Sequence, residues 1–371
     1  MDKIVIEGGN RLMGEVTVSG AKNAVLPLMA ASLLVEDWNT ITNVPRLKDI
    51  ETFKVLLNHL GSEIIHDPGS GVLKIRTQRV KAPEAPYDLV KTMRASILVL
   101  GPLLSRFKVA RVSLPGGCAI GERPIDLHIK GLKKMGADVR IDHGYVTVRA
   151  DRLKGAKIYL DTTTVTGTEN LMLAAVHAEG ATVIENAALE PEVVCLADAL
   201  NRMGARIRGA GTETIRIDGV TELTPVEVRV IPDRIEAGTF MVAAAMTKGN
   251  VFIKDCPYRH LESLSMKLKE AGAQIIEEEG GVRVLGDYPV RSVDVKTVPY
   301  PGFPTDMQAQ IMSMMCTAGG LSVITETVFE NRFMHVGELK RMGADITIDG
   351  RCAVVRGVRS LSGAPLMATD L

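Results

Sequence analysis

Hydrophobic and polar positions along the chain repeat one short pattern five times. In each copy an apolar helix end is followed by a glycine, a small residue, a variable residue and a Val or Ile. The glycines are separated by 75, 68, 68 and 71 residues: Gly61, Gly136, Gly204, Gly272 and Gly343. Each stands where a helix needs a left-handed residue after its C-terminus, and a strand is expected next. Any α/β protein contains such joints, but the near-constant spacing predicts a repeated unit.

A second phrase recurs in the same period, at 178–186, 247–255 and 318–326, and predicts a helix, a glycine turn and a strand. Units of this size bury their apolar faces against one another. If the architecture is two domains of three units, a sixth copy is needed. The chain ends 28 residues after Gly343, so we expect most of a sixth unit to be missing.

The composition of the 371 residues is that of a packed globular protein, with 46% hydrophobic and 24% charged residues. Lys plus Arg and Asp plus Glu are both 44, so no overall basic field attracts nucleic acid or an anionic membrane. The 12-residue apolar stretch 24–35 contains Pro27 and is too short for a membrane span. The first residues lack the features of a signal peptide. We therefore expect a cytoplasmic protein.

The five cysteines, 118, 195, 256, 316 and 352, are scattered and form no CxxC pair, which argues against a disulfide framework or a cysteine metal site. Cys118 lies in a segment with three glycines and two prolines, residues 111–128, which predicts a mobile surface loop. A lone cysteine is more often a small buried hydrophobe. Arg111 and Arg123 nearby in sequence favour a lowered thiol pKa and a role in proton transfer or attack.

Three other segments carry candidate chemistry. Lys22 and Asn23 precede an apolar helix, where free N–H groups suit an anion, although an ordinary turn with a solvated lysine fits as well. Lys91 and Arg94 are three residues apart and are expected on one helix face, as ligand contacts or as a solvated face. Asp306 follows Pro304 and Thr305 at a predicted helix start, where it could cap the helix or act as a general base.

Eight phrases together resemble the bacterial enolpyruvyl transferases that act on UDP-N-acetylglucosamine, through essentially the whole chain. They are SGAKNA (19–24), PYDLVKTMRAS (86–96), SLPGGCAIGERPIDLHI (113–129), ENAALEPE (185–192), PDRIEAGTF (232–240), FPTDMQAQ (303–310), ITETVFENRFMHV (324–336) and LSGAPLMATDL (361–371). The resemblance implies an α/β fold of two inside-out barrels built from βαβαββ units. It also implies a first domain over 22–231 with a catalytic loop at 111–124, and a second over 1–21 plus 232–371.

The resemblance implies transfer of the enolpyruvyl group of phosphoenolpyruvate to the 3-hydroxyl of UDP-N-acetylglucosamine, with release of phosphate, in the first committed step of peptidoglycan synthesis. Cys118 matches the acid that protonates C3, can form an adduct with phosphoenolpyruvate and is the expected target of fosfomycin. Asp306 matches the base for the sugar hydroxyl. Lys22, Asn23 and Arg123 match the phosphoenolpyruvate contacts, with Lys22 and Arg123 also counted as catalytic.

The nucleotide-sugar contacts implied by the resemblance lie in four segments: Arg94; Arg123, Pro124, Ile125, Asp126 and Leu127; Thr162, Thr163, Thr164 and Val165; and Asp306 with Val328. Supporting site residues are His128, Arg332, Asp233 and Asp370. No metal and no cofactor are implied, because arginines and lysines supply the positive charge. The oligomeric state is left open.

Two positions depart from the family pattern. Some members carry a lysine after the residue that matches Asp161, and here the residue is Thr162. The family also continues past ATDL with an arginine and a further arginine beyond it, so we expect the chain as given to be an incomplete catalyst.

Two other functions stay open. The related transferase of aromatic biosynthesis, which uses shikimate 3-phosphate, shares the fold and chemistry without needing the cysteine loop. A catalytically dead paralogue or regulatory binding protein on the same scaffold is the other, because fold does not fix function. The intact Cys118, Asp306, Lys22 and Arg123 argue against it.

Overall fold

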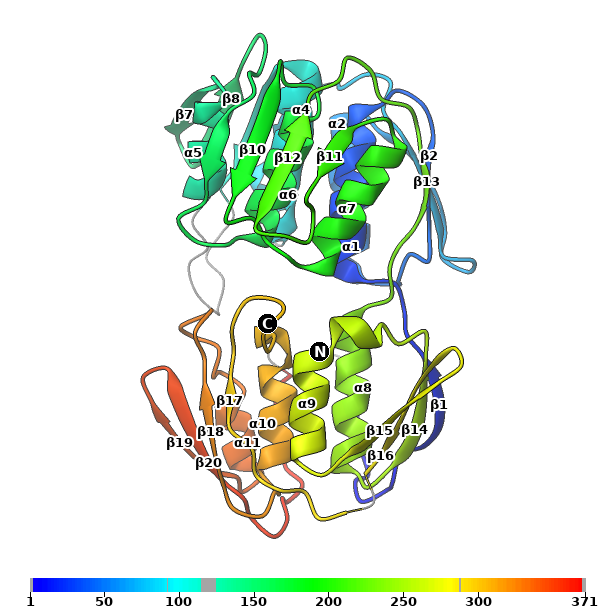
Figure 1. Ribbon diagram of the computed structural model, residues 1–371, viewed down its shortest axis with the longest axis vertical. Helices are drawn as coiled ribbons and strands as arrows, with labels where there is room; N and C mark the ends of the chain where they lie inside the picture. Colours follow the sequence, from blue (N-terminus) through cyan, green and yellow to red (C-terminus); the bar gives the residue numbers. More distant parts are fainter. Residues whose placement is uncertain (1–2, 92, 115–124, 287, 369–371) are drawn as a thin grey trace. The chain divides into compact units, whose positions relative to one another are not determined.

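The computed structural model describes residues 3–91, 93–114, 125–286 and 288–368. The chain forms two compact units (Figure 1). The described residues from Ser19 to Ile231 make one of them, here called the middle unit. Those up to Val18 and from Pro232 onward make the other, here called the end unit because it contains both ends of the chain.

The described residues of the middle unit include three four-stranded sheets. In each sheet, one outer strand pairs in parallel with its neighbour and the other two pairings are antiparallel. In spatial order the sheets are β13 (Glu227–Arg229), β2 (Asn39–Thr42), β4 (Val72–Arg76) and β3 (Glu63–Asp67); β5 (Glu84–Ala85), β6 (Val109–Ser113), β8 (Tyr145–Arg149) and β7 (Asp138–Asp142); and β11 (Arg206–Arg208), β12 (Thr214–Asp218), β10 (Ala181–Glu185) and β9 (Lys157–Tyr159).

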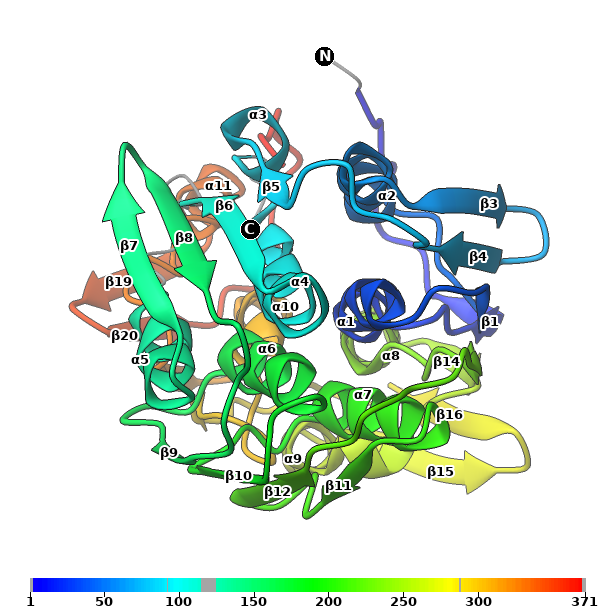
Figure 2. The same cartoon turned by 90° about the horizontal axis from the view of Figure 1, so that it is seen from above.

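The sheets of the middle unit enclose helices (Figure 2). The α-helices are α1 (Lys22–Ala31), α2 (Lys48–Leu60), α3 (Tyr87–Val90), α4 (Leu100–Phe107), α5 (Asp126–Lys134), α6 (Val165–Ala175) and α7 (Pro191–Arg202), with 3-10 turns η1 (Ser32–Leu34) and η2 (Arg94–Val99). Small residues let the inner helices approach closely. A Cβ on Gly101 of α4 would lie 2.3 Å from the carbonyl oxygen of Asn170 in α6, so only glycine fits there.

The end unit has two four-stranded sheets among its described residues, arranged like those of the middle unit. They are β1 (Met13–Thr17), β14 (Asn250–Lys254), β16 (Gly281–Leu285) and β15 (Gln274–Glu278); and β17 (Val295–Lys296), β18 (Leu321–Thr325), β20 (Cys352–Arg356) and β19 (Asp345–Asp349). Its helices are α8 (Arg234–Met246), α9 (Glu262–Glu270), α10 (Gln308–Met315) and α11 (Val336–Arg341), with η3 (Tyr258–His260) and η4 (Thr305–Met307). Strand β1 pairs in parallel with β14, which lies on the far side of the middle unit in the sequence, with Met13 opposite Asn250.

The repeat predicted from the glycines is confirmed by the structure. The elements from β9 to β12 run strand, helix, strand, helix, strand, strand, and β17 to β20 follow the same order. All five repeat glycines have left-handed backbone, with φ of 111°, 91°, 107°, 111° and 93° in chain order. Because side chains disfavour this conformation, glycine at these positions marks where each helix ends.

Each unit has its own apolar core. One buried cluster is drawn from residues between Ala21 and Val230, and the other from Val18 and residues between Ala237 and Val355. In the part of the chain that the structure describes, no helix has the length and apolar character needed to cross a membrane.

Candidate active site

Asp306 and Arg332 form an ion pair in the end unit. Pro304 is the N-cap of η4, and Asp306 lies in that turn, as the sequence predicts. Asp306 Oδ1 is 2.7 Å from Nη2 of Arg332. The arginine side chain is 6% exposed and the aspartate side chain 36% exposed. The carboxylate is therefore held from the protein side by a buried cation and still reaches the surface, which suits a base better than a helix cap.

Arg332 is fixed by its surroundings. Its guanidinium carbon lies 5.5 Å from the ring centre of Phe329, and its carbonyl accepts a hydrogen bond from the Gln308 side chain at 3.3 Å. Burial, and secondarily the charge of Arg332, lowers the pKa of His335 to about 4, so this imidazole is neutral at pH 7. Nη1 of Arg332 is buried without a hydrogen-bond partner among the described residues, which leaves a donor for a ligand oxygen.

Lys22 and Asn23 begin helix α1 in the middle unit, as predicted. Ala21 is the N-cap and supplies no side-chain hydrogen bond to the first turn. The Lys22 ammonium lies 3.4 Å from Oδ2 of Asp49, in the first turn of α2, and Asn23 is exposed. A cation therefore stands at a helix N-terminus, which favours anions, although the lysine already has an acidic neighbour.

The prediction that Lys91 and Arg94 share a helix face is wrong. Helix α3 ends at Val90 and η2 begins at Arg94, with Met93 in extended conformation between them. Lys91 pairs with Asp88 at 2.6 Å. Burial lowers the pKa of the Arg94 guanidinium, so this arginine is partly withdrawn from solvent while Lys91 belongs to an exposed local pair.

Residues 125–128 form the start of helix α5. Ile125 is its buried N-cap, Asp126 is exposed and Leu127 is half-buried. His128 is buried, and burial lowers the pKa of its imidazole to about 4. Its Nδ1 lies 2.9 Å from Nδ2 of Asn170 in α6.

The Asn170 amide decides how the two side chains share this contact. Its Oδ1 accepts from the backbone N–H of Gly101 at 2.6 Å, so its Nδ2 must donate to His128. His128 is therefore neutral with its proton on Nε2. It fixes α5 against the inner helices, which is a supporting role.

The segment from Thr162 to Val165 leads into helix α6. Thr162 is exposed, and the Thr163 hydroxyl donates to Oδ1 of Asn186 at 3.1 Å. Thr164 is the N-cap of α6, and its Oγ1 accepts from Gly167 N–H at 3.3 Å. This places hydroxyls and the helix N-terminus at one end of α6, near the surface of the middle unit.

The supporting residue Asp233 has a structural role that the sequence analysis did not assign. It is the N-cap of α8, where Oδ1 accepts from Ile235 N–H at 2.8 Å and from Glu236 N–H at 3.1 Å. These bonds satisfy two of the free donors at the helix start. Val328, in the end unit, is partly exposed, with its N–H held by Glu326 at 2.8 Å.

The predicted loop over 111–128 is too long at both ends. Arg111 and Ser113 belong to β6, and α5 begins at Asp126. The Arg111 guanidinium contacts Glu84 at 2.8 Å and lies 3.9 Å from the centre of the Tyr145 ring. Arg111 is thus a strand residue with its own anionic and aromatic partners.

Four of the predicted site residues, Cys118, Arg123, Pro124 and Asp370, lie outside the described residues. Of the others, the structure brings together Asp306, Val328 and Arg332 in the end unit. Lys22, Arg94, Ile125, Asp126, Leu127, His128 and the 162–165 segment belong to the middle unit.

Two acidic residues that were not predicted from the sequence hold predicted site residues. Asp49 pairs with Lys22, and Glu326 accepts hydrogen bonds from the backbone N–H of Val328 and from the hydroxyl of Thr305. Glu326 could have been noticed in the sequence, because a carboxylate directly follows the apolar strand β18. For Asp49 the sequence indicates only a position in the first turn of a helix.

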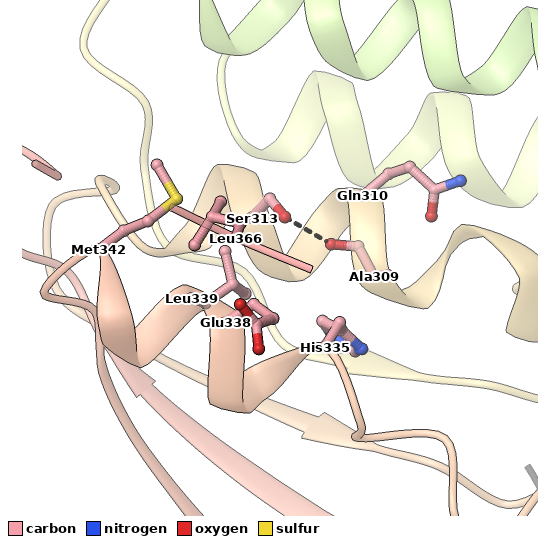
Figure 3. Close-up of a pocket in the computed structure, with 8 residues that line it drawn as sticks. All are labelled: Ala309, Gln310, Ser313, His335, Glu338, Leu339, Met342 and Leu366. Carbon is pink, nitrogen blue, oxygen red and sulfur yellow. Dashed lines mark hydrogen bonds between the residues drawn. The ribbon is translucent and has the colours of Figure 1, made fainter. Parts of the chain in front are cut away.

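A cavity of about 240 Å³ lies between α10 and α11, covered in part by Leu366 (Figure 3). Its walls are mainly apolar, and the Ser313 hydroxyl donates to the Ala309 carbonyl at 2.8 Å. None of the predicted site residues lines it. It is not the candidate active site. In the described part of the chain, no group of three or more His, Cys, Asp or Glu residues could hold a metal ion.

Comparison with known proteins identifies the fold. The enolpyruvyl transferase NikO from Streptomyces tendae superimposes with a TM-score of 0.85 at 25% identity, covering 95% of this chain and 83% of that one. An EPSP synthase from Acinetobacter baumannii has a TM-score of 0.70 at 20% identity, covering 98% and 86%. The predicted fold class, the inside-out α/β barrel of enolpyruvate transferases, is confirmed.

Relatives at high identity cover the whole chain. The UDP-N-acetylglucosamine 1-carboxyvinyltransferase of Desulfatibacillum aliphaticivorans is 62% identical over 371 residues, and those of Geotalea daltonii and Geobacter metallireducens are 60% and 59% identical. The chain spans 89%, 88% and 88% of these proteins. A family model described as EPSP synthase (3-phosphoshikimate 1-carboxyvinyltransferase) matches residues 6–371. The chain therefore belongs to the EPSP synthase family and is an enolpyruvyl transferase.

Proposed function

We propose that this enolpyruvyl transferase uses phosphoenolpyruvate and UDP-N-acetylglucosamine and catalyses the first committed step of peptidoglycan synthesis. The observation that carries the substrate assignment is the 59–62% identity, over the full chain, to three proteins named for that reaction. Such identity is far above the 20% shared with an EPSP synthase of the same fold.

The reaction is an addition followed by an elimination. The 3-hydroxyl oxygen of the sugar bonds to C2 of phosphoenolpyruvate, the hydroxyl proton goes to a base, and an acid delivers a proton to C3. In the second step a proton leaves C3, the bond from C2 to the phosphate oxygen breaks, and phosphate departs. The product is the enolpyruvyl ether of the nucleotide sugar.

Asp306 is the proposed base for the sugar hydroxyl. Its carboxylate is partly exposed and is oriented by the buried Arg332. A positioned base of this kind contributes about 10²- to 10⁴-fold to the rate. The second terminal nitrogen of Arg332, buried and without a hydrogen-bond partner among the described residues, supports a further role in binding an anionic oxygen of the substrate.

Lys22, Asn23 and Arg123 are the proposed phosphoenolpyruvate contacts, and Cys118 is the proposed acid at C3. The position of Lys22 and Asn23 at the start of α1 supports this, because a helix N-terminus favours carboxylate and phosphate groups. For Arg123 and Cys118 the proposal rests on the sequence resemblance alone.

The nucleotide-sugar contacts are proposed residue by residue from the sequence resemblance. Arg94, Ile125, Asp126, Leu127 and the residues from Thr162 to Val165 are in the middle unit, with Arg123 and Pro124 added on the sequence resemblance; Asp306 and Val328 are in the end unit. Exposed Thr162 and the backbone groups at the start of α6 support hydrogen bonding to a phosphate or sugar oxygen. A lysine-type charge contact is not proposed at Thr162.

Domain organisation and location are part of the proposal. We propose that the two barrel domains are 22–231 and 1–21 plus 232–371, with the supporting residue Asp370 in the second; among the described residues, the compact units differ from this division only in residues 19–21, which belong to the middle unit. A cytoplasmic location follows from the substrates, because both are anionic metabolites that do not cross a membrane unaided.

One other substrate has a specific observation in its favour. The family model that matches the chain is described by its shikimate 3-phosphate reaction. Phosphate release from phosphoenolpyruvate decides between the two acceptors when each is supplied separately. We expect release with UDP-N-acetylglucosamine and none with shikimate 3-phosphate.

The same assay tests Asp306. We expect Asp306→Asn to lower kcat by at least 100-fold, while binding of the nucleotide sugar, measured by calorimetry, stays within a few-fold. Release with shikimate 3-phosphate alone would overturn the substrate assignment. Binding of the nucleotide sugar without any release would instead support a binding protein on the same scaffold.

A further inference from the structure

Glu326 is a buried carboxylate with both oxygens engaged. Its side chain is fully enclosed. Oε1 accepts hydrogen bonds from the Thr297 hydroxyl at 2.8 Å, from Val328 N–H at 2.8 Å and from Phe329 N–H at 3.1 Å. Oε2 accepts from the Thr305 hydroxyl at 2.8 Å. Hydrogen bonds to a carboxylate are stronger than those to a neutral oxygen. These four bonds therefore hold the segments that carry the donors in place around Glu326.

The bonds of Glu326 reach both segments that carry the Asp306–Arg332 ion pair. Thr305 is the residue directly before Asp306, and it begins η4. Val328 and Phe329 start the segment that leads to Arg332, and the Phe329 ring lies beside the arginine guanidinium. One carboxylate therefore links the turn that holds the proposed base to the segment that holds its partner.

The same position in other repeat units also carries a polar residue that holds a neighbouring segment. Asn186 follows β10 as Glu326 follows β18, and its side chain binds Leu160 O at 2.8 Å and the Thr163 hydroxyl at 3.1 Å. Asn43 follows β2 and donates to Val230 O at 3.0 Å. The longer, charged side chain of Glu326 bonds residues of three segments, at 297, 305 and 328–329.

We propose that Glu326 is a positioning residue for the general base. Through the Thr305 hydroxyl and the amides of Val328 and Phe329, it sets the separation and direction of the Asp306 carboxylate and the Arg332 guanidinium. Glu326 does not itself take the substrate proton, because it is enclosed and both its oxygens are occupied. This inference rests on the proposed function through the role of Asp306.

The Thr305 hydroxyl is the link that can be removed with the least disturbance. Thr305→Val keeps the shape and deletes the hydrogen bond to Glu326, whereas Thr305→Ser keeps the hydroxyl and deletes a methyl group. Thr325→Val is the matched control, because Thr325 lies one residue before Glu326 and its hydroxyl lies 3.6 Å from Cys352 Sγ, away from the ion pair's two segments. Glu326→Gln removes the charge with little change in shape.

Displacement of a reacting group by about 1 Å can cost about 100-fold in rate. We therefore expect Thr305→Val and Glu326→Gln to lower kcat by about 10- to 100-fold with KM for both substrates changed less than about threefold. Thr305→Ser and Thr325→Val should keep at least half of the wild-type kcat. If Thr305 has only a structural role, Thr305→Ser, which loses the methyl group, should lower kcat as well. The loss of kcat among the variants would then parallel the fall in their thermal midpoints.

Crystal structures of the Thr305 variants provide a readout that does not depend on turnover. We expect the distance from Asp306 Oδ1 to Arg332 Nη2 to exceed hydrogen-bonding range in Thr305→Val and to stay near 2.7 Å in Thr305→Ser. If the wild type releases no phosphate with UDP-N-acetylglucosamine, the proposed function fails and the distances alone decide the positioning role. A Thr305→Val protein with an intact ion pair, or with wild-type kcat, would overturn the inference.

Discussion

At the scale of single residues, burial separates the groups that can react from those that support them. Arg332 and His128 are enclosed, whereas Asp306 and Lys22 are partly open to solvent. An enclosed charge or ring holds a neighbour in one geometry, and Arg332 in addition keeps one terminal nitrogen without a hydrogen-bond partner among the described residues. The proposed catalytic carboxylate is thus the exposed member of a pair whose other member is fixed by the protein.

Cysteine reactivity follows the same distinction. Burial raises the pKa of Cys195 and Cys316 to about 11 and that of Cys256 to about 12, so these thiols carry almost no thiolate at pH 7.5. We expect iodoacetate and fosfomycin, both small anionic electrophiles, to label Cys118 first, because its sequence setting favours a lowered pKa. Peptide mapping after brief exposure measures the order, with Cys118→Ser as the control. Earlier labelling of Cys195 or Cys316 would refute the assignment.

Buried His128 makes the stability of the middle unit depend on pH. Burial lowers the pKa of His128 from its ordinary 6.5 to about 4, so as pH falls the unfolded chain binds the proton before the folded one does. Stability is therefore full above pH 6.5 and is lost as pH falls toward 4. Between pH 7 and pH 5 we expect this residue to remove about 2 kcal/mol of unfolding free energy.

The control for this prediction is His128→Gln, whose side-chain oxygen can still accept from Asn170. Urea unfolding at pH 7 and pH 5 should show that wild type loses about 2 kcal/mol more than the variant between the two pH values. Equal losses would mean that His128 does not titrate as its burial requires.

At the scale of elements, the repeat glycines show which features the sequence alone can predict. The left-handed residue that ends a helix can be predicted from the sequence, because glycine is favoured in that conformation. All five predicted glycines have left-handed backbone. The break between α3 and η2 at Met93 and the inclusion of Arg111 in β6 were not predictable. Arg111 is held in β6 by tertiary contacts with Glu84 and Tyr145, and such contacts leave no local signal in the sequence.

The candidate site was predictable to a similar degree. The proline before Thr305 and Asp306 predicted the helical turn that carries Asp306. Arg332 was predicted as a site residue only from the resemblance to a known family. The role of Glu326 was not predictable, because its hydrogen-bond partners at 297, 305 and 328–329 come together only through the packing of β17, η4 and β18.

Gly343 and Gly337 provide a matched test of the repeat joint. Gly343 follows α11 with φ of +93°, and nothing lies within 4 Å of a Cβ added there. Gly343→Ala should therefore cost about 1–2 kcal/mol of stability from backbone strain alone. Gly337 lies inside α11, also with open space around it and without a left-handed φ.

Gly337→Ala should leave stability unchanged or raise it by up to about 1 kcal/mol, because alanine is the better helix former. Thermal and urea unfolding of the two variants measure the difference. If both substitutions have the same effect, the left-handed joint is not what fixes the end of the helix.

At the scale of the whole molecule, the apolar core is divided into two separate clusters, and this division determines which parts of the chain can fold independently. Each buried cluster is drawn from one unit only. The two ends of the middle unit meet, since Ala21 N–H donates to Ile231 O at 2.8 Å, and β13 completes a sheet with β2. The end unit instead needs β1, from the start of the chain, as the partner of β14.

This arrangement predicts that residues 19–231 fold on their own with one cooperative transition. A fragment of residues 19–225 is the control, because it lacks β13 and leaves β2 without its parallel neighbour; we expect its midpoint to fall by several degrees. Residues 232–371 alone leave an edge of β14 uncovered, and an unpaired edge invites association between chains. We expect that fragment to aggregate and to become more soluble when residues 3–18 are added as a peptide. Circular dichroism and size-exclusion chromatography measure both effects. A fragment 19–231 that melts without cooperativity would show that its core depends on the rest of the chain, against the separate cores seen in the structure.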